Sequence, residues 1–327
     1  MAERARVDHF DGEHFFNPEG ARRNVSRFRA LKWLTRRGTR SPWPKRRLNQ
    51  FWPPPVDLVT PGQVAVTFIG HSSFLLRLSG LTLLTDPIFS ERCSPLSFIG
   101  PRRVRAPGQP LSALPRPDAI LLSHNHYDHC DVPSLRALRA RFGRVPLFAP
   151  LGNKAWLEAK GLGPVIELDW WQTVPCRDAA ITLTPARHFA ARTLRDRNTT
   201  LWGGFMINHA AGAERIYFAG DTGFTTHFEP IRARLGAPDL ALLPIGAYEP
   251  RWFMESVHMN PDDAVRAFQI LGARRALGMH FGTFQLTDEP VDAPLEDLAR
   301  ARRAANLTPD QFDTLDFGET RHFALRA

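Results

Sequence analysis

Short apolar runs of strand length, separated by turn residues, recur along the chain from about residue 64 onward. The first three, at residues 64–70, 74–78 and 81–85, follow one another closely, and Ser79-Gly80, a typical turn pair, joins the last two. This spacing predicts a meander of three strands. Later apolar runs predict further strands at residues 119–123, 145–149, 165–170, 180–184, 201–207, 215–219, 240–245 and 276–279.

Apolar residues at helical spacing lie between these later strands. Leu135, Leu138 and Phe142, for example, fall on one face of a helix. The clearest helix start is at Asn260, an N-cap residue that is followed by Pro261 in the first turn. A strand meander followed by alternating helices and strands predicts an α/β fold in which helices cover sheets. The predicted helices are residues 133–142, 153–160, 227–235, 261–271 and 294–305.

The composition is that of a globular protein without a membrane span. The 327 residues are 43% hydrophobic and 23% charged, which allows one large domain with an appendage. No apolar run approaches the roughly 20 residues that a membrane span needs, and the N-terminus lacks the apolar middle of a signal peptide. Three scattered cysteines do not form a disulfide framework. These features predict a soluble, cytoplasmic protein.

Basic charge is concentrated at the N-terminus. Residues 1–50 hold thirteen Lys or Arg and five acids, a surplus of +8 out of the formal net charge of +9. The stiff sequence WPPP at residues 52–55 then marks a boundary. We therefore expect a basic, aromatic N-terminal arm at residues 1–55 and a nearly neutral domain at residues 56–327. The arm could bind anionic lipid headgroups or nucleic-acid phosphates. Alternatively, its aromatic side chains pack on the domain while its arginines stay in solvent.

A cluster of metal-binding side chains follows the apolar strand predicted at residues 119–123. The sequence there is SHNHYDHCD, and its donors are His124, His126, Asp128 and His129. Imidazoles and carboxylates bind Zn²⁺ and related divalent ions. Residues two apart in extended backbone point the same way, so His124 and His126 can face one metal while the other two donors face a second.

Three more donors stand at the ends of other predicted strands. His188, Asp221 and His280 are each the first donor after an apolar run. Functional side chains of α/β sheets gather at the carboxyl ends of strands. We therefore expect these three side chains to join the cluster at residues 124–129 in a centre that holds two adjacent metal ions.

The order H-x-H-x-D-H, followed at long spacings by His, Asp and His, resembles that of the metallo-β-lactamase-fold hydrolases. Within that group, the chain is similar to the N-acyl-phosphatidylethanolamine-hydrolysing phospholipase D family. The similarity covers the chain from about residue 64 to the C-terminus. The strings that carry it are GHSS (70–73), LTDPIFS (84–90), ILLSHNHYDHCD (120–131), VIELDWW (165–171), FAGDTG (218–223), PIGAYEPRWFM (244–254) and HFGTF (280–284).

The resemblance implies an αββα four-layer sandwich, the metallo-β-lactamase fold, with two zinc ions. Fe²⁺ or Mn²⁺ stays open as an alternative, because nitrogen and oxygen donors suit these ions too. The implied ligands are His124, His126 and His188 for one metal, Asp128, His129 and His280 for the other, and Asp221 as the bridge.

The resemblance also implies roles for side chains around the metals. Asp86 would orient a metal ligand from behind, and Asp128 would orient the attacking water or accept its proton. His258 would donate to the leaving group. Asp86 is explained equally well as a turn residue before Pro87. For His258 the alternative, an entry residue of the helix that begins near residue 260, is slightly disfavoured.

The implied reaction is hydrolysis of a phosphodiester by a metal-bridging hydroxide. N-acyl phosphatidylethanolamine, or a related phospholipid, would give phosphatidic acid and an N-acylethanolamine. A zinc-bound water ionises near pH 7, so the sequence needs no Ser, Cys or Lys nucleophile. The expected partners are the phospholipid substrate and, through the arm, a membrane surface. A homodimer stays open, and nucleic acid is disfavoured because the domain is nearly neutral.

Other functions remain compatible with the same residues. A dinuclear site could open a soluble phosphorylated lactone or hydrolyse another phosphoester. A nuclease or an RNA-binding protein is a weaker alternative that depends on the basic arm. A metal-bearing protein without activity is disfavoured because all seven donors are present.

Overall fold

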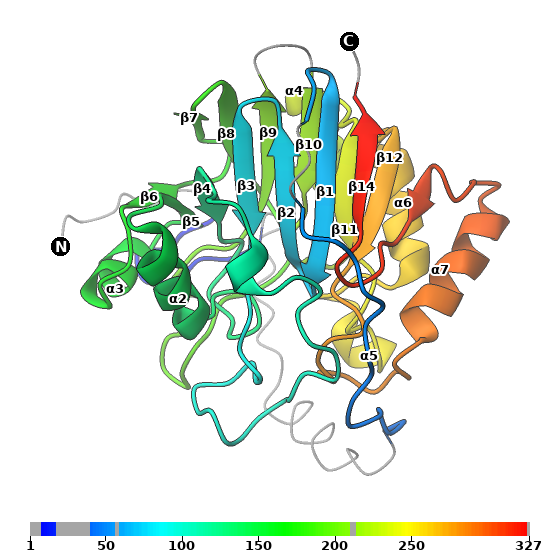
Figure 1. Ribbon diagram of the computed structural model, residues 1–327, viewed down its shortest axis with the longest axis horizontal. Helices are drawn as coiled ribbons and strands as arrows, with labels where there is room; N and C mark the ends of the chain where they lie inside the picture. Colours follow the sequence, from blue (N-terminus) through cyan, green and yellow to red (C-terminus); the bar gives the residue numbers. More distant parts are fainter. Residues whose placement is uncertain (1–7, 18–39, 56–58, 210–213, 326–327) are drawn as a thin grey trace.

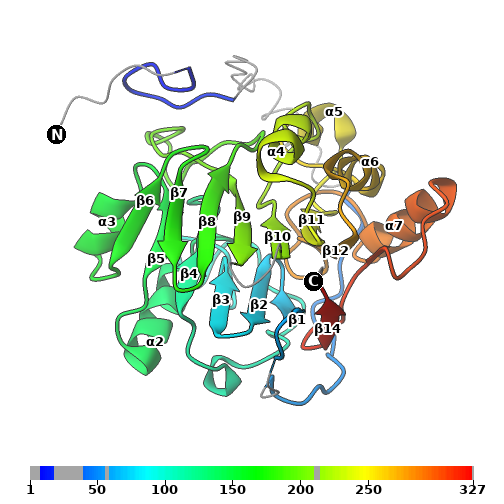
Figure 2. The same ribbon diagram turned by 90° about the horizontal axis from the view of Figure 1, so that it is seen from above.

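Two β-sheets face each other, and helices cover the outer face of each, as Figures 1 and 2 show. The computed structural model describes residues 8–17, 40–55, 59–209 and 214–325. The layers are helix, sheet, sheet and helix, so the predicted αββα four-layer sandwich is confirmed.

The first sheet has the strand order β14-β1-β2-β3-β4-β5-β6 and contains the predicted meander. Neighbouring side chains alternate between its faces, so Phe68 joins the core between the sheets and Ile69 joins the core under the helices. Both faces are covered, and the strands therefore appear as continuous apolar runs in the sequence. The strands are β1 (Gln63–Gly70), β2 (Ser73–Leu78), β3 (Leu81–Thr85), β4 (Ala119–Leu121), β5 (Leu147–Pro150), β6 (Val165–Leu168) and β14 (Thr320–Ala324).

The second sheet has the order β13-β12-β11-β10-β9-β8-β7. Strands β10, β11 and β12 are parallel. Strand β8 runs in the same direction, because β9 pairs antiparallel with both β8 and β10. The carboxyl ends of β8, β10 and β12 thus share one edge of the sheet. The strands are β7 (Thr173–Cys176), β8 (Ala179–Thr184), β9 (Gly204–His209), β10 (Glu214–Phe218), β11 (Leu240–Pro244), β12 (Arg275–Met279) and β13 (Phe312–Asp313).

Each sheet has its own helices. α2 (Val132–Phe142) and α3 (Lys154–Ala159) cover the first sheet, with Leu135 and Leu138 of α2 in the core beneath them. α4 (Phe228–Leu235), α5 (Arg251–Met254), α6 (Pro261–Leu271) and α7 (Ala293–Ala304) lie beside the second. The start predicted for α6 is confirmed, since Asn260 and Asp263 form a reciprocal capping box. None of the helices in the described residues is long and apolar enough to cross a membrane.

Five elements of the described residues were not predicted from the pattern: β7, β13, β14, α5 and the short 3-10 helix η2 (Leu111–Ala113). Strand β7 contains a proline and is partly exposed at the edge of its sheet, where a strand is paired on one side only. β13 and β14 also lie at edges, and β13 has two residues. Edge strands need no continuous apolar run, so the periodicity in the sequence does not mark them.

The described parts of the N-terminal arm, residues 8–17 and 40–55, contact the domain. Phe15 is 1% exposed and belongs to the main core. Arg40 pairs with Asp288, and Arg47 pairs with Asp292. The basic stretch at residues 18–39 lies outside the described residues, and so do residues 56–58, which follow the predicted boundary at residue 55. The division of the chain into an arm and a domain therefore stays a prediction.

Candidate metal centre

All seven predicted donors lie together at the carboxyl ends of strands from both sheets. The loop after β4 carries His124, His126, Asp128 and His129, because α2 starts only at Val132 and leaves this segment free of regular structure. His188, Asp221 and His280 follow β8, β10 and β12, whose ends share one edge of the second sheet. The strand directions thus bring together residues that lie up to 156 positions apart in the sequence.

Three imidazoles form one group of donors. Nε2 of His124 lies 2.8 Å from Nδ1 of His126, and Nε2 of His188 lies 3.3 Å from the same Nδ1 atom. Their potential ligand atoms are all within 4.8 Å of one another. This is the geometry of three ligands that face a single ion.

A carboxylate and two imidazoles form a second group. Oδ2 of Asp128 lies 3.4 Å from Nε2 of His129 and 3.5 Å from Nε2 of His280. Asp221 lies between this group and the first one. Its Oδ2 atom is 3.1 Å from Nε2 of His280, 3.2 Å from Nε2 of His129 and 3.8 Å from Nε2 of His188. One carboxylate oxygen is therefore within reach of both groups.

Asp86 fixes one imidazole from each group. Its Oδ2 atom accepts a hydrogen bond from Nδ1 of His129 at 2.7 Å and one from the Ser123 hydroxyl at 2.5 Å. Oγ of Ser123 in turn lies 2.9 Å from Nδ1 of His124. Because Nδ1 of each ring is engaged on this side, Nε2 of each ring faces the centre, where it can bind a metal ion in its deprotonated form.

Two further contacts hold donors that Asp86 does not reach. Nδ1 of His188 donates to the carbonyl of Val257 at 2.9 Å, which leaves Nε2 free toward the centre. The guanidinium of Arg192 donates to the carbonyls of Asn125 and Cys130, and so closes the loop between β4 and α2 from behind. No spacing in the sequence marks Arg192, since an arginine that binds backbone carbonyls leaves no such signal.

His71 is a donor that the sequence analysis missed. It follows β1, and its Nε2 atom lies 3.0 Å from Oδ2 of Asp128, so it joins the second group. It belongs to the quoted string GHSS and directly follows an apolar strand, which is the same signal that marked His188 and His280. That signal could therefore have identified it.

His258 lies at the rim of the centre. Its Nδ1 atom is 3.9 Å from Oδ2 of Asp221, and its ring packs against the ring of His188. The side chain is 12% exposed, and that of Asp128 is 13% exposed, whereas that of Asp221 is 2% exposed. Solvent or a substrate therefore reaches the centre on the side of Asp128 and His258.

Burial and neighbouring charges shift the pKa values of the donors in different directions. Burial opposes charge on Asp128 and Asp221, but His129 and His280 together with other neighbours outweigh it, so the pKa of each carboxyl lies well below its usual range. Burial also opposes protonation of His129 and His280. Asp221 and Asp128 outweigh it and raise the pKa of His129 well above its ordinary value and that of His280 to about 9. Burial lowers the pKa of the other imidazoles: His126 and His258 to about 4, His71 to about 3, and His124 and His188 well below the ordinary value.

These atoms fit a divalent cation. Nε2 of His129, Nε2 of His280 and Oδ1 of Asp221 are buried, and none has a hydrogen-bond partner within the described residues. Unpaired buried polar atoms are costly, so such a group in one place indicates a missing ligand. The donors are all imidazole nitrogen and carboxylate oxygen, a set that suits Zn²⁺, Fe²⁺ or Mn²⁺.

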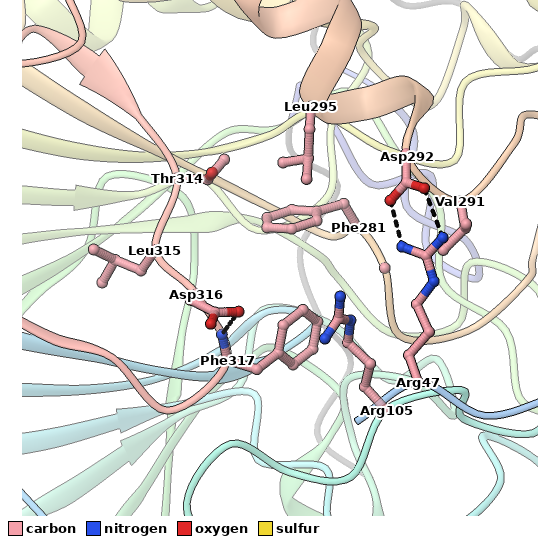
Figure 3. Close-up of a pocket in the computed structure, with 11 residues that line it drawn as sticks. Arg47, Arg105, Phe281, Val291, Asp292, Leu295, Thr314, Leu315, Asp316 and Phe317 are labelled. Atoms are coloured by element: carbon pink, nitrogen blue, oxygen red, sulfur yellow. Dashed lines mark hydrogen bonds and ion pairs between the residues drawn. The ribbon is translucent and has the colours of Figure 1, made fainter. Parts of the chain in front are cut away.

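A separate pocket of about 170 Å³ has none of the seven donors in its wall (Figure 3). Its apolar side includes Phe281, the residue after His280, and Phe317. At its rim, Arg47 of the arm pairs with both carboxylate oxygens of Asp292 at 2.5 and 2.6 Å. Arg47 of the arm and Phe281, the neighbour of the donor His280, thus line the same pocket.

Two facing sheets, covered by helices and with a histidine and aspartate centre at one edge, define the metallo-β-lactamase fold. Residues 82–281 match the family model described as a β-lactamase superfamily domain. The chain belongs to this superfamily and is a metal-dependent hydrolase.

Similar proteins agree with this assignment. The chain is 39% identical over 268 residues to an N-acyl-phosphatidylethanolamine-hydrolyzing phospholipase D of Caenorhabditis elegans, which covers 77% of this chain and 74% of the relative. It is 40% identical over 269 residues to an uncharacterized protein of Mycobacterium tuberculosis, which covers 78% and 70%. Among solved structures, a metallo hydrolase of Ignicoccus hospitalis matches with a TM-score of 0.61 and 24% identity, which covers 81% of this chain and all of that one, and supports the fold.

Proposed function

We propose that the chain is a phosphodiesterase of phospholipase D type. It would hydrolyse N-acyl phosphatidylethanolamine, or a related phospholipid, to phosphatidic acid and an N-acylethanolamine, and it would use two bound zinc ions. The observation that carries this proposal is the 39% identity over 268 residues to the C. elegans enzyme of that name, in a chain whose seven donors lie together.

The donors divide between two metal positions. The imidazoles of the first group would hold one ion, the second group would hold the other, and Oδ2 of Asp221 would contact both. Two divalent ions bound in this way activate a water molecule and stabilise negative charge on a phosphoryl oxygen. The residues for the first position are His124, His126 and His188, and those for the second are Asp128, His129 and His280. His71, the further member of the second group, would hydrogen-bond to Asp128.

In this proposal Asp128 and His258 are the side chains that act on the substrate. The oxygen of water would bond to phosphorus while the bond from phosphorus to the N-acylethanolamine oxygen breaks. Asp128 would orient the water and accept its proton, because its carboxylate stays ionised and faces the open side. The proton then neutralises the departing alkoxide. His258, which is neutral, would donate a hydrogen bond from its ring to a substrate oxygen on that side.

The test is product analysis. Purified protein, reconstituted with Zn²⁺, is incubated with vesicles that contain N-acyl phosphatidylethanolamine, and lipids are analysed by mass spectrometry. Phosphatidic acid and N-acylethanolamine in equal amounts are expected. Elemental analysis of the same sample counts the metal ions. Diacylglycerol in place of phosphatidic acid, or no product from this lipid, would overturn the assignment.

A soluble phosphoester is the second candidate, because the same donors would act on any phosphoester that reaches Asp128. A phosphorylated lactone tested beside the vesicles separates the soluble substrate from the phospholipid: faster turnover of the lactone, with no dependence on vesicles, would favour the soluble substrate.

A nuclease is the weaker candidate. If the protein does not retain RNA at about 50 mM salt, a nuclease is ruled out.

Exposed apolar side chains support a lipid surface as the place of action. In the described part of the arm, Leu48 is 79% exposed and Phe51 is 85% exposed. In the loop between β3 and β4, Phe98 is 75% exposed and Ile99 is 56% exposed. Liposome sedimentation of the full chain and of a variant with Leu48→Ser and Phe51→Ser tests the arm as a membrane contact. Equal binding by both forms would contradict that role.

A further inference from the structure

We infer that Asn17 in the N-terminal arm is a positioning residue of the metal centre. Its side-chain amide is bonded to both backbone groups of His188. Nδ2 of Asn17 donates to the carbonyl of His188 at 3.1 Å, and the amide N–H of His188 donates to Oδ1 of Asn17 at 3.0 Å. A residue 171 positions away in the sequence thus completes the backbone bonding of a donor.

The pair has the pattern of two residues that face each other in a sheet. A carboxamide presents one donor and one acceptor side by side, as a peptide group does. An aspartate at this position could accept from the N–H of His188 but could not donate to its carbonyl. An alanine would leave both backbone groups without these bonds, although His188 is 1% exposed. Burial makes such unpaired groups costly.

The orientation of the His188 ring depends on this backbone. The residue lies beyond the end of β8, so the sheet ladder does not hold it. Its ring is fixed at one end, where Nδ1 meets the carbonyl of Val257. Asn17 fixes the other end, the main chain. With both ends held, Nε2 points toward His126 and Asp221, the direction in which it can serve as a ligand.

The arm is anchored well enough to place Asn17. The ring of His9 stacks on Trp170 at 4.5 Å, and its Nε2 atom lies 2.7 Å from Oδ1 of Asp169. Phe15 is buried in the main core, and its backbone N–H donates to the carbonyl of Asn198 at 2.8 Å. Residues 8–17 therefore form a fixed support under the loop after β8, and we assign this part of the arm to the metal centre rather than to an external surface.

This inference rests on the proposed function in one respect, which is that His188 binds a metal ion. The experiment compares Zn²⁺ affinity, measured by competition with a chromophoric chelator, in the full chain and in the variants Asn17→Ala, Asn17→Asp and Asn17→Gln. Glu13→Gln is the matched control, since the side chain of Glu13 lies in the same segment and is 83% exposed. Visible absorption of the Co²⁺-loaded protein reports the ligand geometry.

We expect Asn17→Ala to weaken one of the Zn²⁺ sites by about 10- to 100-fold and to change the Co²⁺ spectrum. Asn17→Asp should lie between Asn17→Ala and the unmodified chain, and Glu13→Gln should match the unmodified chain. Asn17→Gln, which keeps both hydrogen-bonding groups, should recover part of the affinity. If Asn17→Ala fails to fold, Asn17→Asp and Asn17→Gln still give the comparison.

Two results separate the possible errors. The inference is overturned if Asn17→Ala and Asn17→Asp both bind Zn²⁺ within twofold of the unmodified chain and lose the same melting temperature in the metal-free and loaded forms. Asn17 would then be a structural contact. Failure of the unmodified chain to bind Zn²⁺ would instead overturn the proposed metal centre itself.

Discussion

The carboxylate of Asp86 accepts a hydrogen bond from Nδ1 of His129 at 2.7 Å, and both side chains are fully buried. The same carboxylate also accepts from the backbone N–H of Ser123 at 2.7 Å and from its hydroxyl. Burial raises the pKa of Asp86 despite these bonds. Three donors thus converge on one side chain that lies directly behind the centre.

Asp86→Asn should lower metal affinity by about 10- to 100-fold. An amide has one acceptor oxygen, so it cannot accept all three hydrogen bonds, and its NH₂ group would face another donor. Metal content after dialysis and the rate of hydrolysis check this result. Asp118→Asn is a suitable control, because Asp118 bonds to Thr82 and Arg177 and takes no part in the centre. Normal metal retention by Asp86→Asn would contradict the positioning role.

Asp128→Asn should keep the fold and lower the rate of hydrolysis by at least about 100-fold. The amide is similar in size but loses the charge that can accept the proton of water. It also loses one potential contact to each of His129 and His280. Circular dichroism confirms folding, and the initial rate on a lipid or soluble phosphoester measures the loss. Full activity in this variant would rule out the proposed site.

His258→Ala should lower kcat by about 100-fold or more while metal content stays unchanged. The reason is that His258 lies at the rim, 3.9 Å from Asp221, and faces the side from which a substrate enters. The measurement is a comparison of kcat, KM and metal content with those of the unmodified chain. A loss of metal in proportion to the loss of rate would identify His258 as a ligand instead.

The docking of residues 8–17 should weaken as the pH rises above about 6.5. Burial opposes the charge of His9, but hydrogen bonds to Asp169 and Asp8 outweigh it and raise the pKa of His9 above its ordinary value of 6.5. The protonated ring is therefore favoured in the folded chain. Its contribution to stability is complete below pH 6.5 and is lost as the pH rises through the higher folded value.

Hydrogen exchange of the Phe15 and Phe16 amides, compared at pH 6 and pH 9 after correction for intrinsic rates, measures this docking. Their backbone N–H groups donate to Asn198 and His9. His9→Gln should remove the difference between the two pH values. An equal difference in His9→Gln would mean that another group controls the contact.

Phe281→Ala should lower the free energy of unfolding by about 3–5 kcal/mol. The ring is 5% exposed, lies 5.4 Å from the ring of Phe68 and meets Phe317 edge-on. Chemical denaturation measures the effect. Phe98→Ala, at a side chain that is 75% exposed, should stay within about 0.5 kcal/mol. A loss below about 1 kcal/mol for Phe281→Ala would show that neighbouring side chains move into the space that the ring leaves.

Much of the fold and the centre could be predicted because the relevant signals are local. Continuous apolar runs marked the central strands, and the predicted donors lie in the segments that follow β4, β8, β10 and β12. His71 follows an apolar strand in the same way, so its position after β1 is a signal of the same kind. Asn17 and Arg192 act through backbone groups of distant loops, and no spacing in the sequence reports such contacts.

The amino-acid sequence by itself determined the strands, the helix caps and the donors at strand ends, because these depend on side chains a few residues apart. Only the tertiary structure decided that His71 joins the second group, that Asp86 serves both groups and that the first residues of the arm support His188. Those relationships depend on which strands pair and on how two sheets and a terminal segment pack. Packing brings together residues that are far apart in the chain, and a one-dimensional pattern does not encode that proximity.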